Sequence, residues 1–175
     1  MMFRWLIIAL LSLAAAAVGY VLTMNAIPNI IMGVAIKRVS QDEKAFNVWT
    51  HGPRTTETSR AIVRPSPDLA YSSCAYDLSK GPVRITVNPW TDYYSLSLYQ
   101  ANTDNSWVKN DREVGGKAID VLLISKDMKV KVQAGTDVVT SPSERGIALV
   151  RRLAPTADAF AKAAASRQSD VCKGS

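Results

Sequence analysis

The chain opens with a long apolar segment and then changes to short stretches in which apolar and polar residues alternate. No charged side chain occurs from residue 5 to residue 36, and residues 5–24 are almost purely apolar. A helix needs about 20 residues to cross ~30 Å of hydrocarbon. The pattern predicts an N-terminal transmembrane anchor over residues 1–26, and a core helix of a soluble protein fits this length and position less well.

A cleaved signal peptide would look similar, because Ala15 and Ala17 are small enough for a peptidase site. However, the apolar run continues past these alanines to Leu22, and Arg4 is the only positive side chain before it. These features favour an uncleaved anchor.

The next segment, residues 27–60, separates the anchor from the rest of the chain. Pro28 suits the first turn of a helix, and apolar residues then recur on one side at Ile30, Ile31, Val34 and Ile36. Residues 50–59 are rich in turn formers. We expect a juxtamembrane helix, lying at the interface or extending the anchor, followed by a linker or extended arm.

The residue pattern of 61–175 is typical of a β domain. Residues 83–87 and 93–100 alternate between apolar and polar side chains, and the short turn between them predicts an antiparallel hairpin. Further strands are predicted at 71–77, 119–125, 130–133, 137–140 and 146–153, and a helix at 157–168. The fold class predicted is mainly β: an antiparallel sandwich or open barrel with a short C-terminal helix.

The net charge of +6 is spread along the chain, with acidic residues between the basic ones. Nucleic-acid binders normally concentrate basic residues in a stripe, so we expect no nucleic-acid partner. Attraction to anionic lipid headgroups and simple solubility are two accounts of the mild excess.

The two cysteines bear on the compartment. Cys74 and Cys172 are an even pair in a small domain, which suits a disulfide in an oxidising compartment, although two unrelated thiols fit the sequence as well. Basic residues flank both ends of the anchor, so the positive-inside rule gives almost no bias. We expect a single-pass protein of the inner membrane with its C-terminal domain in the periplasm.

Catalytic motifs are scarce. His51 is the only histidine, and it lies in a Gly-Pro loop, so we expect no metal site and no organic cofactor, and a Ser-His-Asp triad is disfavoured. Tyr93 and Tyr99 fall on one face of their strand with serines between them. Such a face is typical of a sugar- or amphiphile-binding groove, and equally of a solvated sheet surface.

A proline-rich segment precedes the first strand. Pro65 and Pro67 hold the backbone extended, so that Arg64 and Asp68 are presented with little conformational freedom. These two side chains would form a salt bridge where the strand begins or, with Tyr71, the polar rim of a ligand site.

The same region carries a family resemblance. Residues 64–73 and 76–83 resemble the DUF1254 family in their Asp-x-x-Tyr-Ser segment and the Asp-Leu-x-x-Gly-Pro turn that follows, and residues 94–96 and 141–151 look like its later landmarks. The resemblance covers roughly residues 60–153. It implies a β-rich domain and no known reaction. Longer relatives carry a second domain, DUF1214, so the resemblance also implies a companion chain of that type as a partner.

Together these features predict a membrane-anchored bacterial envelope protein that binds a partner chain or an envelope ligand. The candidate ligand-binding residues are Arg64, Asp68, Tyr71, Tyr93 and Tyr99. The alternative is a hydrolase or lyase that acts on an envelope or carbohydrate-like substrate through Arg64, Asp68, Tyr71 and Tyr93. The absence of catalytic motifs favours binding.

Overall fold

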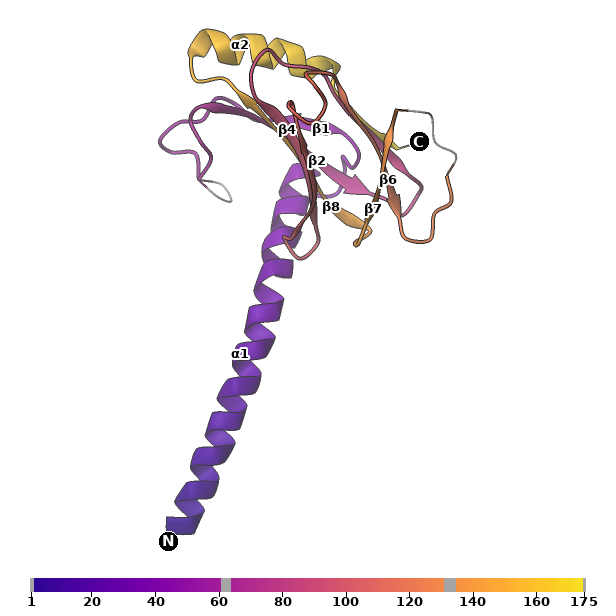
Figure 1. The fold of residues 1–175 in the computed structure, drawn as a ribbon. Coiled ribbons are helices and arrows are strands. Elements are labelled where there is room, and N and C mark those ends of the chain that lie inside the picture. Colours follow the sequence, from indigo (N-terminus) through magenta and orange to yellow (C-terminus); the bar gives the residue numbers. More distant parts are fainter. Residues whose placement is uncertain (1, 61–63, 131–134, 175) are drawn as a thin grey trace.

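The computed structural model describes residues 2–60, 64–130 and 135–174. A single long helix, α1 (Met2–Val39), projects away from a β-rich domain (Figure 1). Within the described residues, α1 is the one helix that is long and apolar enough to cross a membrane, and no residue of its most apolar stretch is buried. The predicted N-terminal apolar helix is therefore present, and its apolar surface is exposed.

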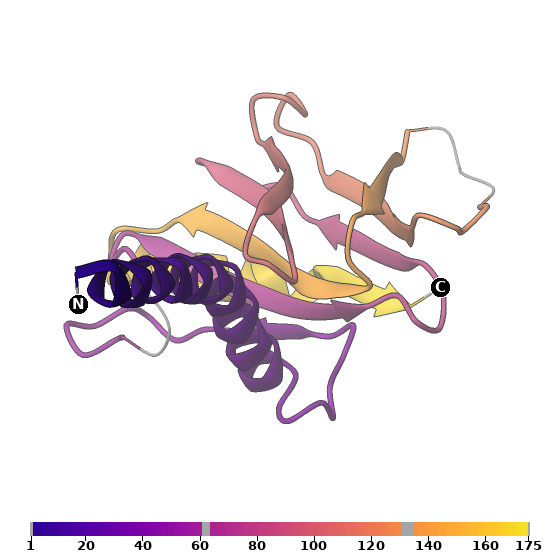
Figure 2. The same ribbon diagram turned by 90° about the horizontal axis from the view of Figure 1, so that it is seen from below.

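Helix α1 is continuous through the segment predicted to be juxtamembrane, so this segment extends the apolar helix. Asn25 and Asn29 do not interrupt it, because their side-chain amides donate to helix carbonyls of Val21 and Asn25, at 2.8 and 3.0 Å. Pro28 lies inside the helix. Proline removes a backbone hydrogen bond and commonly bends a helix, and the helix axis changes direction part-way along (Figure 2).

Two sheets form the β domain. The first, sheet A, has the strand order β1 (Trp49–His51), β2 (Leu69–Asp77), β8 (Arg145–Leu153), β4 (Tyr94–Gln100), β5 (Asn105–Asn110), and its neighbours are antiparallel. The second, sheet B, has the order β7 (Asp137–Ser141), β6 (Ile119–Ser125), β3 (Val83–Val87), β9 (Val171–Gly174), in which β6 and β7 are parallel. The predicted mainly β, largely antiparallel fold is confirmed, and the described strands do not close into a barrel.

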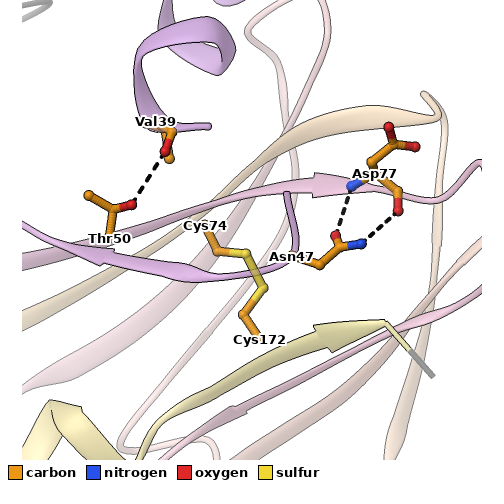
Figure 3. The surroundings of a disulfide bond; sticks show 6 residues. All are labelled: Val39, Asn47, Thr50, Cys74, Asp77 and Cys172. Atoms are coloured by element: carbon orange, nitrogen blue, oxygen red, sulfur yellow. Dashed lines mark hydrogen bonds between the residues drawn. A yellow bond between two sulfur atoms is a disulfide. The ribbon is translucent and has the colours of Figure 1, made fainter. Parts of the chain in front are cut away.

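The core lies between the facing sides of the two sheets. Val83, Ile85 and Val87 of β3 and Leu96 and Leu98 of β4 are fully buried there. A disulfide between Cys74 of β2 and Cys172 of β9 joins sheet A to sheet B across this core (Figure 3).

The predicted hairpin of residues 83–87 and 93–100 is wrong. Strand β3 pairs with β6 and β9 in sheet B, whereas β4 pairs with β8 and β5 in sheet A. Both strands bury one face against the same core, so their alternation fits partners across the sandwich as well as partners in one sheet. The connection between them is held by Asn88, whose N–H donates to Asp170, and by Trp90, whose indole donates to the carbonyl of Leu153.

Other boundaries also differ from the predictions. The sheet begins with β1 at Trp49–His51, within the predicted linker, and β5 and β9 were not predicted. The predicted C-terminal helix is present as α2 (Ala157–Ser166) followed by the short η1 (Arg167–Ser169), with Thr156 as its N-cap. In Figure 1, α2 lies at the end of the domain away from the anchor. The predicted strand at 130–133 falls almost wholly outside the described residues.

The C-terminal end of α1 is fastened to the outer face of sheet A. Met32, Ala35 and Ile36 of the helix pack against Ala75 of β2 and Ile147 of β8. The helix therefore meets the domain through side chains that point away from the sandwich core.

Hydrogen bonds complete this junction. Thr50 donates to the carbonyl of Val39 at 3.3 Å, and the side chain of Asn47 bonds both the N–H and the carbonyl of Asp77 (Figure 3). The contacts position the last turns of the anchor over one side of sheet A.

Gly146→Ala is expected to destabilise the domain by about 1–3 kcal/mol, the usual cost of overpacking a core. A Cβ at Gly146 would lie 2.1 Å from the carbonyl oxygen of Tyr99 and 2.3 Å from the hydroxyl of Tyr76, which itself donates to that carbonyl. Thermal unfolding of the full chain in detergent would measure the loss. Gly52→Ala is the control, because its Cβ meets nothing closer than 3.5 Å; equal melting temperatures for the two variants would refute the prediction.

Candidate functional site

A groove of about 530 Å³ lies between the end of α1 and the outer face of sheet A. Its helix wall is apolar and consists of Ile31, Met32, Ala35 and Val39. Its sheet wall is mixed and comes from β2, β8 and β4, with Tyr71, Ser73, Tyr99, Ile147, Leu149 and Arg151. Arg64, Pro65 and Thr103 complete the lining.

The sheet wall follows from strand register. Cys74 and Arg152 face the core, so their neighbours in β2 and β8 face outward. Pairing places Tyr71 opposite Arg151, and Ser73 opposite Leu149. Three adjacent strands thus present alternate side chains to the same groove.

Arg151 is held in a defined position on this wall. Its guanidinium donates to the hydroxyl of Tyr99 at 2.9 Å and to that of Ser97 at 3.2 Å. Ser97 is fully buried beside it. Among the described residues, no carboxylate forms an ion pair with Arg151, so its charge faces the groove with neutral partners only.

Arg64 lies on the exposed side of the groove, next to Pro65. The alternative prediction of an Arg64–Asp68 salt bridge is wrong, because the ion pairs of the described chain include neither residue. The side chain of Asp68 is exposed. Its backbone carbonyl accepts a hydrogen bond from the N–H of Ala154 at 2.7 Å.

The structure gathers only some of the predicted ligand-binding residues. Arg64, Tyr71 and Tyr99 line the groove, whereas Asp68 and Tyr93 do not. The hydroxyl of Tyr71 accepts from the N–H of Ser66 at 2.8 Å, which ties the proline-rich segment to the groove. Tyr93 precedes β4 and donates to Ser95 at 2.9 Å.

Arg151 was not among the predicted residues. It stands beside Arg152 in a β-strand, and adjacent residues of a strand point to opposite faces. One of the two arginines therefore had to face outward, but which of them did so depends on the register with β2.

A second polar cluster lies on the inner face of sheet A. The guanidinium of Arg152 makes two 2.8 Å hydrogen bonds to the carboxylate of Asp170, and both side chains are almost fully buried. Arg167 donates to the backbone carbonyls of Tyr71 and Gly52. Burial lowers the pKa of Arg167, and the charge of Arg152 lowers it further. These contacts fasten the segment before β9 to the sheet.

His51 touches this cluster. Its Nδ1 lies 2.9 Å from the hydroxyl of Ser72, which is 1% exposed. Partial burial lowers the pKa of His51, and the positive charge of Arg167 lowers it further. Ser72 is closed off from solvent, so the contact is a structural hydrogen bond between β1 and β2 rather than an accessible nucleophile with its base.

The side chains that line the groove determine which chemistry it offers. Its described lining contains no aspartate, glutamate, histidine or cysteine, which are the usual acids, bases and nucleophiles of hydrolases. The part of the chain that the structure describes also contains no cluster of three or more His, Cys, Asp or Glu side chains suited to a metal. What the groove offers is an apolar wall, tyrosine and serine hydroxyls, and two arginines.

One solved structure supports the fold. The VPA0106 protein from Vibrio parahaemolyticus is similar, with a TM-score of 0.60 and 16% identity over 84% of this chain and 37% of that chain. A putative uncharacterized protein from Burkholderia cenocepacia has a TM-score of 0.49 and 10% identity over 70% of this chain and 35% of its own. The present chain thus spans little more than a third of each. A comparison with curated proteins gives no match.

The family follows from the sequence itself. The model of DUF1254, described as a protein of unknown function, matches residues 46–172. The match begins shortly before β1 and ends at Cys172 in β9, so it covers both sheets and the disulfide. The chain therefore belongs to the DUF1254 family.

Proposed function

We propose that this is a single-pass envelope protein that binds an envelope ligand in the groove between α1 and sheet A. The observation that carries the proposal is the position of the groove: the helix that forms its apolar wall continues the long apolar helix that we propose spans the membrane. Pockets of ~300–1,000 Å³ with apolar walls and a few fixed polar groups are typical small-molecule sites, and this groove has those properties.

The proposed location is the inner membrane, with the β domain in the periplasm. The Cys74–Cys172 disulfide supports this placement, because disulfides persist in oxidising compartments and are rare in the cytosol. The exposed apolar surface of α1 supports insertion in a bilayer.

A partner chain is the second candidate. The chain covers 37% of the Vibrio parahaemolyticus protein, so that relative is much longer. A separate chain with a DUF1214-type domain would supply a comparable second part. Co-purification of such a chain in stoichiometric amount from solubilised membranes would support this candidate; a chain that purifies alone would remove it.

Catalysis is the less favoured alternative. A hydrolase or lyase needs groups that transfer protons or attack the substrate. The described lining of the groove supplies only arginine, tyrosine, serine and threonine for this purpose, so ligand binding accounts better for what the groove contains.

Filling the groove is expected to abolish ligand retention. Ser73→Trp would place a large side chain beside Leu149 on the floor of the groove. Native mass spectrometry of the full chain, released from nanodiscs made with bacterial lipid extract, should show a one-to-one small-molecule adduct for the wild type and none for this variant.

Val138→Trp is the matched control, because Val138 is exposed on β7 of the other sheet. It should retain the adduct. Equal adduct levels in the two variants, or no adduct on the wild type, would contradict the proposed function.

A further inference from the structure

The ligand class can be derived from the charges and the location of the groove. This ligand class rests on the proposed function, because it requires the groove to be the ligand site.

The groove lies a short distance along α1 from the segment proposed to span the membrane. The apolar run of α1 ends at residue 24, and the groove wall starts at Ile31. At 1.5 Å per residue this is ~10 Å along the helix, comparable with the headgroup layer on one side of a bilayer, which is ~5–8 Å thick. If residues 5–24 span the hydrocarbon, the end of the groove nearest the N-terminus of α1 lies at the outer edge of the headgroup layer.

Exposed apolar side chains on α1 connect the proposed membrane span with the groove. Ile27, Ile30, Ile31 and Val34 are 45–64% exposed on the intervening turns of α1. Charged side chains begin only at Lys37. An acyl chain can follow this surface from the bilayer to the groove and remain in contact with apolar atoms throughout.

The groove carries positive charge from two arginines. Arg84, Arg145 and Arg152 each form an ion pair with a carboxylate. Within the described residues, Arg64 and Arg151 form none, although both line the groove.

Arg151 is pre-organised for an anion. Its Nη1 donates to the hydroxyl of Ser97 and its Nη2 to that of Tyr99, which fixes the guanidinium without neutralising its charge. A guanidinium fork matches phosphate and carboxylate oxygens and binds them through charge-assisted hydrogen bonds.

We propose that the groove binds one anionic phospholipid of the adjoining leaflet. Its phosphate lies against Arg151 and Arg64, and the first part of an acyl chain lies against Met32, Ala35 and Val39. The rest of the lipid follows α1 toward the bilayer. The apolar wall selects an amphiphile over a soluble anion, and the two arginines select an anionic headgroup over a zwitterionic one.

The test compares the full chain in nanodiscs of phosphatidylcholine with and without phosphatidylglycerol, with bound lipid counted by native mass spectrometry. Arg151→Gln should lower the ratio of bound to unbound protein for phosphatidylglycerol roughly ten-fold, as expected for a lost charge-assisted hydrogen bond. Arg84→Gln removes the same charge from an exposed ion pair on sheet B and should leave this ratio unchanged.

Arg64→Gln gives a second test that does not depend on a half-buried residue, because Arg64 is exposed; it should also lower phosphatidylglycerol binding. An equal loss in Arg84→Gln would overturn the proposal. Displacement of the lipid by millimolar inorganic phosphate would overturn it as well, because the site would then be one for a soluble anion.

The ligand class and the proposed function fail in different ways. Suppose that phosphatidylcholine binds, that Ser73→Trp removes it and that Arg151→Gln leaves it bound. This result would overturn the preference for an anionic lipid but keep the groove as a ligand site. Adducts that Ser73→Trp leaves in place would overturn both.

Discussion

Loss of the Cys74–Cys172 disulfide is expected to lower the free energy of unfolding by about 4–5 kcal/mol, the size that the chain-entropy model gives for a loop of this length. The two cysteines are 98 positions apart in the sequence, so the bond restricts most of the unfolded domain. It also joins β2 of sheet A to β9 of sheet B. Strand β9 has only β3 as a strand neighbour and depends on this covalent link more than the central strands do.

The measurement is chemical unfolding of the full chain in detergent, with and without reductant. The double variant Cys74→Ala/Cys172→Ala is the control, because its unfolding midpoint should be low in both conditions and insensitive to reductant. Amide hydrogen exchange should show the largest increase in β9. A wild-type midpoint that reductant leaves unchanged would contradict the prediction.

Asp170→Asn is expected to destabilise the domain by about 3–5 kcal/mol, the usual cost of removing one partner of a buried ion pair. Arg152 is 1% exposed and would keep its positive charge without a carboxylate in reach. Arg167, 6% exposed, lies close enough for the two charges to repel. Asp170 also accepts the N–H of Asn88, so the connection between the sheets would lose an anchor point.

Replacement of both partners should cost much less than removal of one. In Arg152→Met/Asp170→Leu neither position leaves an unpaired charge, and Arg167 keeps its hydrogen bonds to the carbonyls of Tyr71 and Gly52. Apolar replacements of buried ion pairs are often neutral or stabilising. Asp92→Asn, an exposed turn residue, is the single-site control and should change stability by less than ~0.5 kcal/mol. The prediction is refuted if Asp170→Asn melts no earlier than this control.

The elements with strong periodicity could be predicted from the sequence, and their partners could not. The alternation at Val83, Ile85 and Val87 shows which side of a strand is buried, and this side is the same whether the strand pairs in one sheet or the other. Strand β5 was missed because it is an edge strand with no buried side chain to mark its period. Strand β9 is four residues long and was too short to give a pattern.

The groove, too, could be predicted from the sequence only in part. Tyr99 and Arg64 could be named because a face of alternating tyrosine and serine, and a proline-rich segment, are local features. The apolar wall comes from α1, and the central strand of the floor, β8, lies more than 100 residues further along the chain. Arg151 and Arg152 are indistinguishable by type, and only the register with β2 places one in the groove and the other in the core.

The central claim is that lipid occupies the groove between α1 and sheet A, and a site-specific crosslink tests it most directly. A photoreactive benzoylphenylalanine at position 149 would replace Leu149 on the groove floor, and the same residue at position 138 would serve as the control on the far sheet. After illumination of intact membranes, mass spectrometry of the full chain should find an anionic phospholipid attached at position 149 and none at position 138. Equal labelling at both positions, or no lipid at position 149, would contradict the account.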